Sequence, residues 1–210
     1  TGADLFEITV YGRGGHGSVP LTTIDPINIA CHIVLNLQTI NSREVDAQET
    51  VVLDFGAING GSAGNAIPET VTLKGNIRTF RNDIRSQVKK RITEIADQTA
   101  AMFGGRAEIR YSLEMGTVVT DPEVTALCGN EIKKYVAPDK LNDHTLKLPF
   151  SEDFSYISDR VPSTFFLIGA CPDGSEVIMQ HNPRVIFDED SMKTGVLVYV
   201  AGAMGYLSGG

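Results

Sequence analysis

The sequence contains few cysteines, a deficit of basic residues and no long apolar run. Its cysteines, Cys31, Cys128 and Cys171, are odd in number and far apart, so they lack the paired spacing of a cysteine zinc site. The simplest interpretation is that they are buried, reduced thiols. Lys and Arg total 18 against 26 Asp and Glu, a formal net charge of −8, which argues against a nucleic-acid surface as the main function. The longest apolar stretches are too short to span a membrane and no signal-peptide pattern opens the sequence, which favours a cytoplasmic protein.

Two short patterns typical of metal sites are also missing. The sequence contains no His-x-Asp pair and no adjacent Glu-Glu pair that could bridge two metal ions and supply a general base. A zinc site needs three or four ligands, so an isolated histidine does not complete one. What remains is an ordinary globular composition of 210 residues, 42% hydrophobic and 21% charged, which suits one large domain or two small ones.

The most distinctive stretch is 12–20, in which glycines at 14, 15 and 17 surround His16. An alternating apolar pattern over 4–11 predicts a half-buried strand that leads into it. Glycine removes side-chain bulk and permits backbone angles closed to other residues, so a ligand or another backbone segment can approach closely. The alternative is a glycine-rich turn with an incidental histidine, and a short motif alone does not decide between the two.

The pattern over 1–116 predicts the order strand, helix, strand, strand, helix, strand. The strands are expected at 4–11, 51–58, 70–80 and 107–115, and the helices at 25–41 and from 82 or 83 to the glycines at 104 and 105. Asp25 before Pro26 is expected to cap the first helix, and Asn82 or Asp83 the second. This order is typical of an α+β, ferredoxin-like sandwich, with a four-stranded antiparallel sheet and two helices on one face.

The pattern changes in 117–210. Helices are expected at 121–136 and 190–207, and a strand at 163–169. Such a set has little chance of closing a sheet of its own, so 117–210 is interpreted as an incomplete α/β segment of a larger domain. The chain enters a strand within four residues and has no initiating methionine, so we expect it to be a fragment.

Five polar residues stand out from this scaffold: His16, Asn65, Arg78, Glu152 and His181. A neutral imidazole is a common metal ligand, so His181 could bind Zn or Mn, whereas His16 could donate a hydrogen bond to a developing oxyanion. Asn65 could do the same for a carbonyl or carboxylate, and the planar fork of Arg78 suits a substrate carboxylate. Each residue also has a plain structural interpretation: turns for Asn65 and His181, a solvated strand end for Arg78, and a surface or helix cap for Glu152.

Six stretches in order resemble the dinuclear-metal aminoacylase and carboxypeptidase family of amidohydrolases, and within it the hippurate hydrolase and indole-acetyl-amino-acid hydrolase branch. The stretches are GGHGSVP at 14–20, LQTINSRE at 37–44, GNAIP at 64–68, GNIRTF at 75–80, SEDFS at 151–155 and HNPRVIFDE at 181–189. They are spread over nearly the whole chain, and six ordered motifs are far more specific than one.

The resemblance implies a homodimeric hydrolase of N-acyl amino acids or small peptide-like substrates that holds two divalent metal ions, Zn or Mn. Residues 1–116 would be its lid and dimerisation domain, and 117–210 the C-terminal part of its catalytic domain. By this resemblance His181 is a metal ligand, and His16 reaches into the partner subunit's site to stabilise the tetrahedral oxyanion. Asn65 and Arg78 bind substrate, Arg78 through the substrate carboxylate, and Glu152 lies near the site with no assigned role.

The sequence departs from this family in one large respect. The family's first half, with the general-base glutamate and the remaining metal ligands, including a cysteine in this branch, has no counterpart here. The implied reaction, attack of metal-activated water on an amide carbonyl, therefore belongs to the parent protein. The fragment itself is expected to be inactive, with an incomplete metal site. The second hypothesis is a non-catalytic dimerising or ligand-binding module of ferredoxin-like fold.

Overall fold

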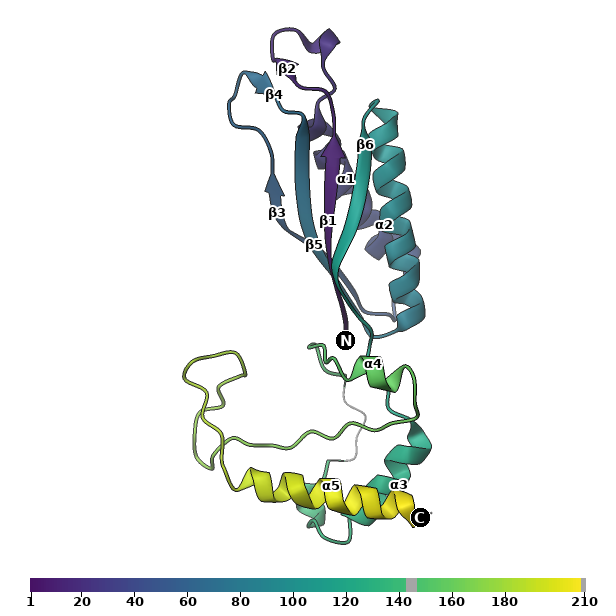
Figure 1. Ribbon diagram of the computed structural model, residues 1–210, viewed down its shortest axis with the longest axis vertical. Helices are drawn as coiled ribbons and strands as arrows, with labels where there is room; N and C mark the ends of the chain where they lie inside the picture. The colour runs from purple at the N-terminus through teal and green to yellow at the C-terminus, as the bar shows by residue number, and fades with distance from the viewer. Residues whose placement is uncertain (143–146, 209–210) are drawn as a thin grey trace. The chain divides into compact units, whose positions relative to one another are not determined.

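A computed structural model describes residues 1–142 and 147–208, which fall into two compact units (Figure 1). The first unit comprises Thr1–Val118 together with Lys147–Tyr156. The second unit holds the rest of the described chain, residues 119–142 and 157–208.

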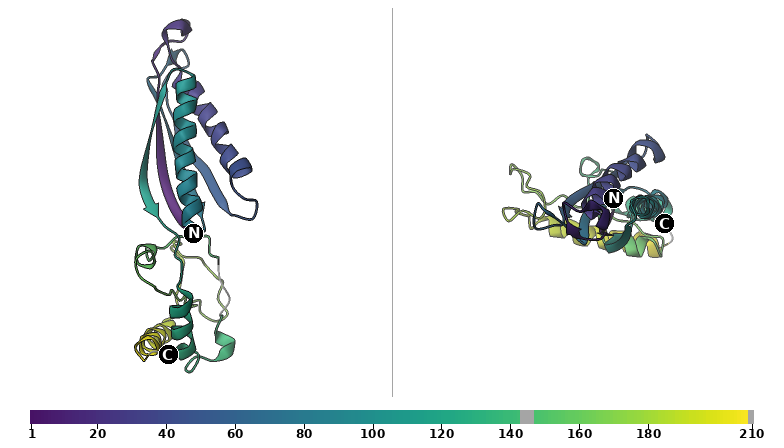
Figure 2. Two further views of the ribbon diagram at one scale, coloured as in Figure 1. Left: turned by 90° about the vertical axis from the view of Figure 1, so that its right-hand side faces the viewer. Right: turned by 90° about the horizontal axis from the view of Figure 1, so that it is seen from above.

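The first unit is built on a four-stranded antiparallel sheet with the strand order β3-β5-β1-β6. Its strands are β1 (Gly2–Tyr11), β3 (Val51–Asn59), β5 (Thr70–Thr79) and β6 (Arg106–Met115). The helices α1 (Pro26–Thr39) and α2 (Asn82–Met102) cover one face of this sheet, as the left view of Figure 2 shows. This is the split-βαβ, ferredoxin-like arrangement that the sequence pattern predicts.

The core of the first unit lies between the sheet and the two helices. On β1 the side chains of Phe6, Ile8 and Val10 are buried, and the residues between them alternate to the other face. The remaining large buried side chains are Leu53, Val71, Leu73 and Ile77 of the sheet, Ile29, Ile33, Leu37, Val88 and Ile92 of the two helices, and Ile40, which follows α1. Full burial of one such side chain contributes about 1.5–3 kcal/mol, so this packing holds both helices on the sheet.

One sheet position requires glycine. Gly75 of β5 pairs with Phe6, and a Cβ added at Gly75 would lie 2.4 Å from Cζ of the Phe6 ring. The ring occupies that space and meets Phe55 of β3 edge-on, with 5.7 Å between the centroids. An aromatic pair thereby fills the core across three strands.

The two expected helix caps have different outcomes. Asp25 caps α1 as predicted, because its carboxylate accepts a hydrogen bond of 2.8 Å from the N–H of Ile27. Helix α2 begins at Asn82 without a side-chain cap, so the prediction of an Asn82 or Asp83 cap is wrong. The side chain of Asn82 instead accepts a hydrogen bond of 3.0 Å from the N–H of Thr117, a partner that is distant in the sequence.

The second unit is formed by α3 (Pro122–Ile132) and α5 (Ser191–Leu207), with the short helix Pro138–Lys140. Asp121 caps α3 by accepting a hydrogen bond of 2.9 Å from Val124 N–H, and the helix ends earlier than expected. Helix α5 lies against α3 at Gly205, where an added Cβ would be 2.8 Å from Cβ of Glu131. Elsewhere, the chain forms a short π-helix at Ile40–Glu44, a 3-10 helix at Pro20–Thr22 and the short α4 (Ser155–Ser158).

The strand expected at 163–169 is wrong. The strands of the described chain all lie within residues 2–115, in the first unit, so no neighbouring strand is available in the second. A strand needs such a neighbour to satisfy its N–H and C=O groups. The side chains of Phe166, Leu167 and Ile168 are left partly exposed.

The structure shows which of the three cysteines are buried. All three cysteines are free, but only Cys128 is buried, and burial raises the pKa of its thiol. Cys31, on the outer face of α1, and Cys171 are exposed, so the interpretation of buried thiols is wrong for these two.

In the part of the chain that is described, no helix is long and apolar enough to cross a bilayer.

Candidate functional site

The glycine-rich stretch around His16 forms a short ribbon with a second loop. Strand β2 (Gly15–His16) pairs antiparallel with β4 (Ala66–Ile67), so that His16 lies opposite Ala66. The N–H of Gly17 donates a hydrogen bond of 2.9 Å to the carbonyl oxygen of Asn65. The structure therefore brings the predicted residues His16 and Asn65 together, on a feature named here the ribbon tip (residues 12–19 and 60–68).

Several glycines are needed for the chain's own packing at the ribbon tip, among them Gly12 and Gly17. A Cβ added at Gly12 would lie 2.2 Å from the carbonyl oxygen of Ile24. One added at Gly17 would lie 3.1 Å from the carbonyl oxygen of Asn65. The close neighbour of these two glycines is thus another backbone segment, one of the two kinds of close approach that glycine permits.

The imidazole of His16 is exposed and bonded locally. Its Nδ1 accepts a hydrogen bond of 3.2 Å from the N–H of Ser18 and lies 2.8 Å from Ser18 Oγ. An open hollow adjoins the ring's strand, lined by residues that include Gly15, Ala66 and Glu69. The ring can therefore present Nε2 to a ligand group at the ribbon tip.

Arg78 lies at the opposite end of the sheet. It is the penultimate residue of β5, and its Nη1 donates a hydrogen bond of 3.2 Å to Ser151 Oγ. Ser151 directly precedes Glu152, so Arg78 and the Glu152 motif meet in the first unit. The part of β5 from Thr70 to Arg78 spans about 26 Å at a strand rise of about 3.3 Å per residue. Arg78 and His16 of one chain are therefore too far apart to touch the same small ligand.

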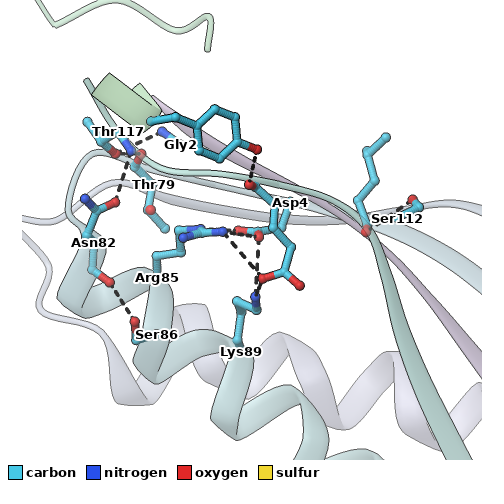
Figure 3. A network of polar contacts seen from close by, with 12 residues as sticks. Gly2, Asp4, Thr79, Asn82, Arg85, Ser86, Lys89, Ser112 and Thr117 are labelled. Carbon is cyan, nitrogen blue, oxygen red and sulfur yellow. Dashed lines mark hydrogen bonds and ion pairs between the residues drawn. The ribbon is translucent and has the colours of Figure 1, made fainter. Parts of the chain in front are cut away.

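A buried ionic network near Arg78 was missed by the sequence interpretation. Asp4 of β1 is 1% exposed and accepts two hydrogen bonds of 2.7 Å from Arg85 of α2 (Figure 3). Lys89 lies 3.6 Å from Asp4 and also pairs with Glu114, where its hydrogen bond lowers the pKa of the Glu114 carboxyl. The sequence did contain a signal for this network. Asp4 is in phase with the buried positions of β1, and a buried carboxylate needs a charged or hydrogen-bonding partner.

Thr117 joins the two ends of the segment from Gly2 to Thr117. The N–H of Gly2 donates a hydrogen bond of 2.9 Å to Thr117 Oγ1, which in turn donates one of 3.1 Å to the carbonyl oxygen of Thr79 (Figure 3). Gly2 opens β1, and Thr117 follows the end of β6. The chain thus enters and leaves the sheet at adjoining positions.

His181, in the second unit, has an unusual backbone. Its φ of 66° lies in the left-handed region, which costs a non-glycine residue about 1 kcal/mol or more. Its side chain is exposed, and the next residue, Asn182, accepts a hydrogen bond of 2.9 Å from Arg184 N–H. Within residues 1–142 and 147–208, no group of three His, Cys, Asp or Glu residues could hold a metal ion. The described residues therefore do not fit a complete metal site.

Comparison with known proteins decides the family. Residues 1–102 match the sequence profile of the M20 peptidase dimerisation domain. Curated relatives that are 30–34% identical align over 90–98% of the chain. The chain belongs to the M20 peptidase family. The family resemblance inferred from the six motifs is confirmed.

The M20 relatives carry hydrolase names. They include a thermostable carboxypeptidase of Saccharolobus solfataricus, 30% identical over 93% of this chain and 49% of the relative. An N-acetyl-L-cysteine deacetylase of Bacillus subtilis is 32% identical over 90% and 44%, and an IAA-amino acid hydrolase of Arabidopsis thaliana is 31% identical over 98% and 47%. The chain thus spans about half the length of the curated relatives it matches.

Solved M20 structures share the fold. A Staphylococcus aureus protein described as an aminohydrolase superposes with a TM-score of 0.84 and 29% identity, over 97% of this chain and 51% of that one. A Bacillus subtilis protein described as a dinuclear metal-binding M20 peptidase gives a TM-score of 0.73 at 23% identity, over 96% and 49%. The predicted α+β fold, with its ferredoxin-like sheet, is confirmed.

We predict that the 210-residue M20 chain binds Zn²⁺ or Mn²⁺ weakly or not at all. The reason is that His181 supplies one ligand, whereas a protein zinc site takes three or four. Equilibrium dialysis followed by elemental analysis is expected to find well under one ion per chain, with the same content in a His181→Ala variant. One tightly held ion that disappears in His181→Ala would contradict the prediction and reveal overlooked ligands.

Proposed function

We propose that this chain is part of a metal-dependent amidohydrolase that cleaves the amide bond of N-acyl amino acids or small peptide-like substrates. The observation that carries the proposal is that backbone pairing at the exposed ribbon tip brings together His16 and Asn65, two residues whose side chains can donate hydrogen bonds. Relatives named carboxypeptidase, N-acetyl-L-cysteine deacetylase and IAA-amino acid hydrolase support this substrate class.

The functional residues of the proposed enzyme lie partly in this chain and partly outside it. Residues 1–116 are assigned as the lid and dimerisation domain, and 117–210 as the C-terminal part of the catalytic domain. His181 is assigned as one ligand of a centre with two divalent ions, Zn or Mn, in a cytoplasmic enzyme. Its other ligands and the general base are assigned to the half of the relatives that the chain does not span, so the chain alone is expected to be inactive.

The residues of the first unit act on the substrate in different ways. His16 donates a hydrogen bond through Nε2 to the carbonyl oxygen as negative charge develops there, with Asn65 as a second donor. Arg78 binds the substrate carboxylate through its guanidinium fork. Glu152 lies beside Ser151, a partner of Arg78, and keeps no assigned role. Because His16 and Arg78 lie at opposite ends of β5, His16 is assigned to the site of the partner subunit in a homodimer.

The homodimer is proposed to form along the β3 edge of the sheet and the neighbouring helix α1. The other edge strand, β6, exposes Arg106, Glu108, Arg110 and Glu114, and a row of charges discourages pairing between sheet edges. Strand β3 instead exposes apolar side chains such as Ile58. On the outer face of α1, Ile27, Cys31 and Leu35 follow at spacings of one helical turn and are all exposed.

Replacing Leu35 with glutamate is expected to weaken this dimer by about tenfold or more, because a charge would be buried in an apolar contact. Met102→Glu is the matched control, since Met102 is 69% exposed and Leu35 67%, but Met102 lies at the end of α2. Sedimentation velocity over a concentration series measures the effect. The β3–α1 interface would be contradicted if the unsubstituted chain were monomeric, or if both variants weakened the dimer equally.

Assay of a full-length protein that carries this chain tests the hydrolase itself. N-acetyl and aromatic N-acyl amino acids and small peptides are offered, with and without a metal chelator, and the 210-residue chain serves as control. We expect hydrolysis of at least one substrate class, its loss on chelation, and no activity of the chain alone. A full-length protein that dimerises but hydrolyses none of these substrates would favour the alternative, a non-catalytic ferredoxin-like module.

A further inference from the structure

Ser18 has no part in the function proposed above, yet it lies against the imidazole at the centre of it. We propose that Ser18 is a positioning residue that holds His16 in one ring orientation and in the neutral tautomer with its proton on Nε2. The catalytic consequence rests on the proposed oxyanion role of His16, but the state of the ring does not.

A tight turn brings Ser18 back over the ring. The N–H of Val19 donates a hydrogen bond of 2.9 Å to the carbonyl oxygen of His16, so residues 16–19 form a β-turn with Gly17 and Ser18 at its centre. Gly17 is fixed in turn by its own hydrogen bond to Asn65, on the facing loop. The backbone that positions Ser18 is therefore part of the ribbon and not a free loop end.

Both polar atoms of Ser18 approach the same ring nitrogen. Its backbone nitrogen lies 3.2 Å from His16 Nδ1, and its Oγ lies 2.8 Å away. A backbone N–H can only donate, so Nδ1 must accept, and the hydroxyl can donate to the same nitrogen. In a neutral imidazole whose Nδ1 accepts, the proton lies on Nε2.

The tautomer decides whether the ring attracts or repels an anionic oxygen. With the proton on Nε2, the exposed side of the ring carries an N–H donor. With the proton on Nδ1, the exposed Nε2 would present a lone pair to the oxyanion. A donor that is fixed before the reaction costs no reorganisation when charge develops. Without the hydroxyl, only the longer hydrogen bond of 3.2 Å from the Ser18 N–H would hold Nδ1. The ring would then turn and exchange tautomers more readily, so the hydroxyl at 2.8 Å strengthens the hold on the Nε2–H donor.

Nitrogen NMR of the 210-residue chain tests the ring state directly. The chain is labelled with ¹⁵N-histidine and recorded at about pH 8.5, where an ordinary imidazole is neutral, and a His16→Gln variant identifies the His16 signals by their loss. We expect the Nε2–H tautomer alone in the parent chain. Ser18→Ala should add a measurable Nδ1–H fraction and ring averaging, whereas Ser18→Thr, which keeps the hydroxyl, should match the parent.

The controls separate positioning from general disturbance. Ser62→Ala removes an exposed hydroxyl from the facing loop and is expected to leave the His16 signals unchanged. In the full-length enzyme, Ser18→Ala should lower kcat about tenfold, by analogy with the loss of a partner that orients a metal-ligating histidine. KM should stay unchanged, and Ser18→Thr should restore kcat. A parent ring with Nδ1 protonated, or a Ser18→Ala spectrum equal to the parent's, would overturn the proposal. If the full-length protein has no hydrolase activity, the ring-state result stands and only the proposed function fails.

Discussion

Replacing His16 with alanine in a full-length protein that carries this chain is expected to lower kcat by about 10²–10³-fold, the usual cost of losing one oxyanion donor. Metal content and fold should not change, because the ring is exposed and its hydrogen bonds are made to Ser18. Steady-state kinetics, elemental analysis and circular dichroism measure the three quantities. His16→Gln, which keeps an N–H donor, should lose less, and an unchanged kcat in His16→Ala would return this residue to an incidental turn histidine.

A hybrid dimer tests where His16 acts. In the full-length protein, His181→Ala is expected to lose metal and therefore activity, and His16→Ala alone keeps only its low residual activity. When the two variants are mixed, one site of each heterodimer would combine an intact metal centre with an intact His16 from the other subunit. Partial recovery of activity is therefore expected. Absence of recovery in proven heterodimers would refute sharing of His16 across the dimer.

Replacing Asp4 with alanine is expected to lower the free energy of unfolding of the first unit by about 3–5 kcal/mol, the usual cost of removing one partner from a buried ion pair. The variant removes the carboxylate that accepts two hydrogen bonds from Arg85, whose side chain is 16% exposed and lies 3.9 Å from the more exposed carboxylate of Glu114. Urea unfolding measures the loss. It is followed by circular dichroism because the chain contains no tryptophan whose fluorescence could be used. A loss below about 1 kcal/mol would show that the Asp4–Arg85 ion pair contributes no more to stability than an exposed ion pair does.

Two controls accompany this experiment. Asp83→Ala removes an exposed partner of Arg81, and its cost should stay below about 1 kcal/mol. The double replacement Asp4→Leu with Arg85→Met should recover much of the Asp4→Ala loss, because a matched apolar pair leaves no unpaired charge at that position. Equal losses in the double and single variants would show that Asp4 acts through packing and not through its charge.

The sequence predicts the first unit well because its signals are local. Alternation along β1 and β5 and the cap at Asp25 depend on neighbouring residues, and the structure keeps them. The predictions that failed depend on distant partners. Asn82 is taken by Thr117 instead of capping α2, and residues 163–169 find no strand to pair with in the described chain.

The candidate site was predictable in part for the same reason. The motifs identify His16, Asn65 and Arg78 one by one, but only the register of β2 with β4 puts His16 beside Asn65. Only the length of β5 shows that Arg78 lies apart from them. The roles of His16, Asn65, Arg78, Glu152 and His181 remain predictions. The Asp4 network needed the pairing of α2 with the sheet before its partners could be named.

The contact between Gly2 and Thr117 makes residues 2–117 a segment whose two ends meet. Such a segment can be inserted into a surface loop of a host domain at one point, because the host chain needs no extra length to reach from one end to the other. Recombination could then move it between hosts through a single junction. The same geometry permits a circular permutant in which a short linker joins Gly2 to Thr117 and new termini open in the exposed turn at 46–50.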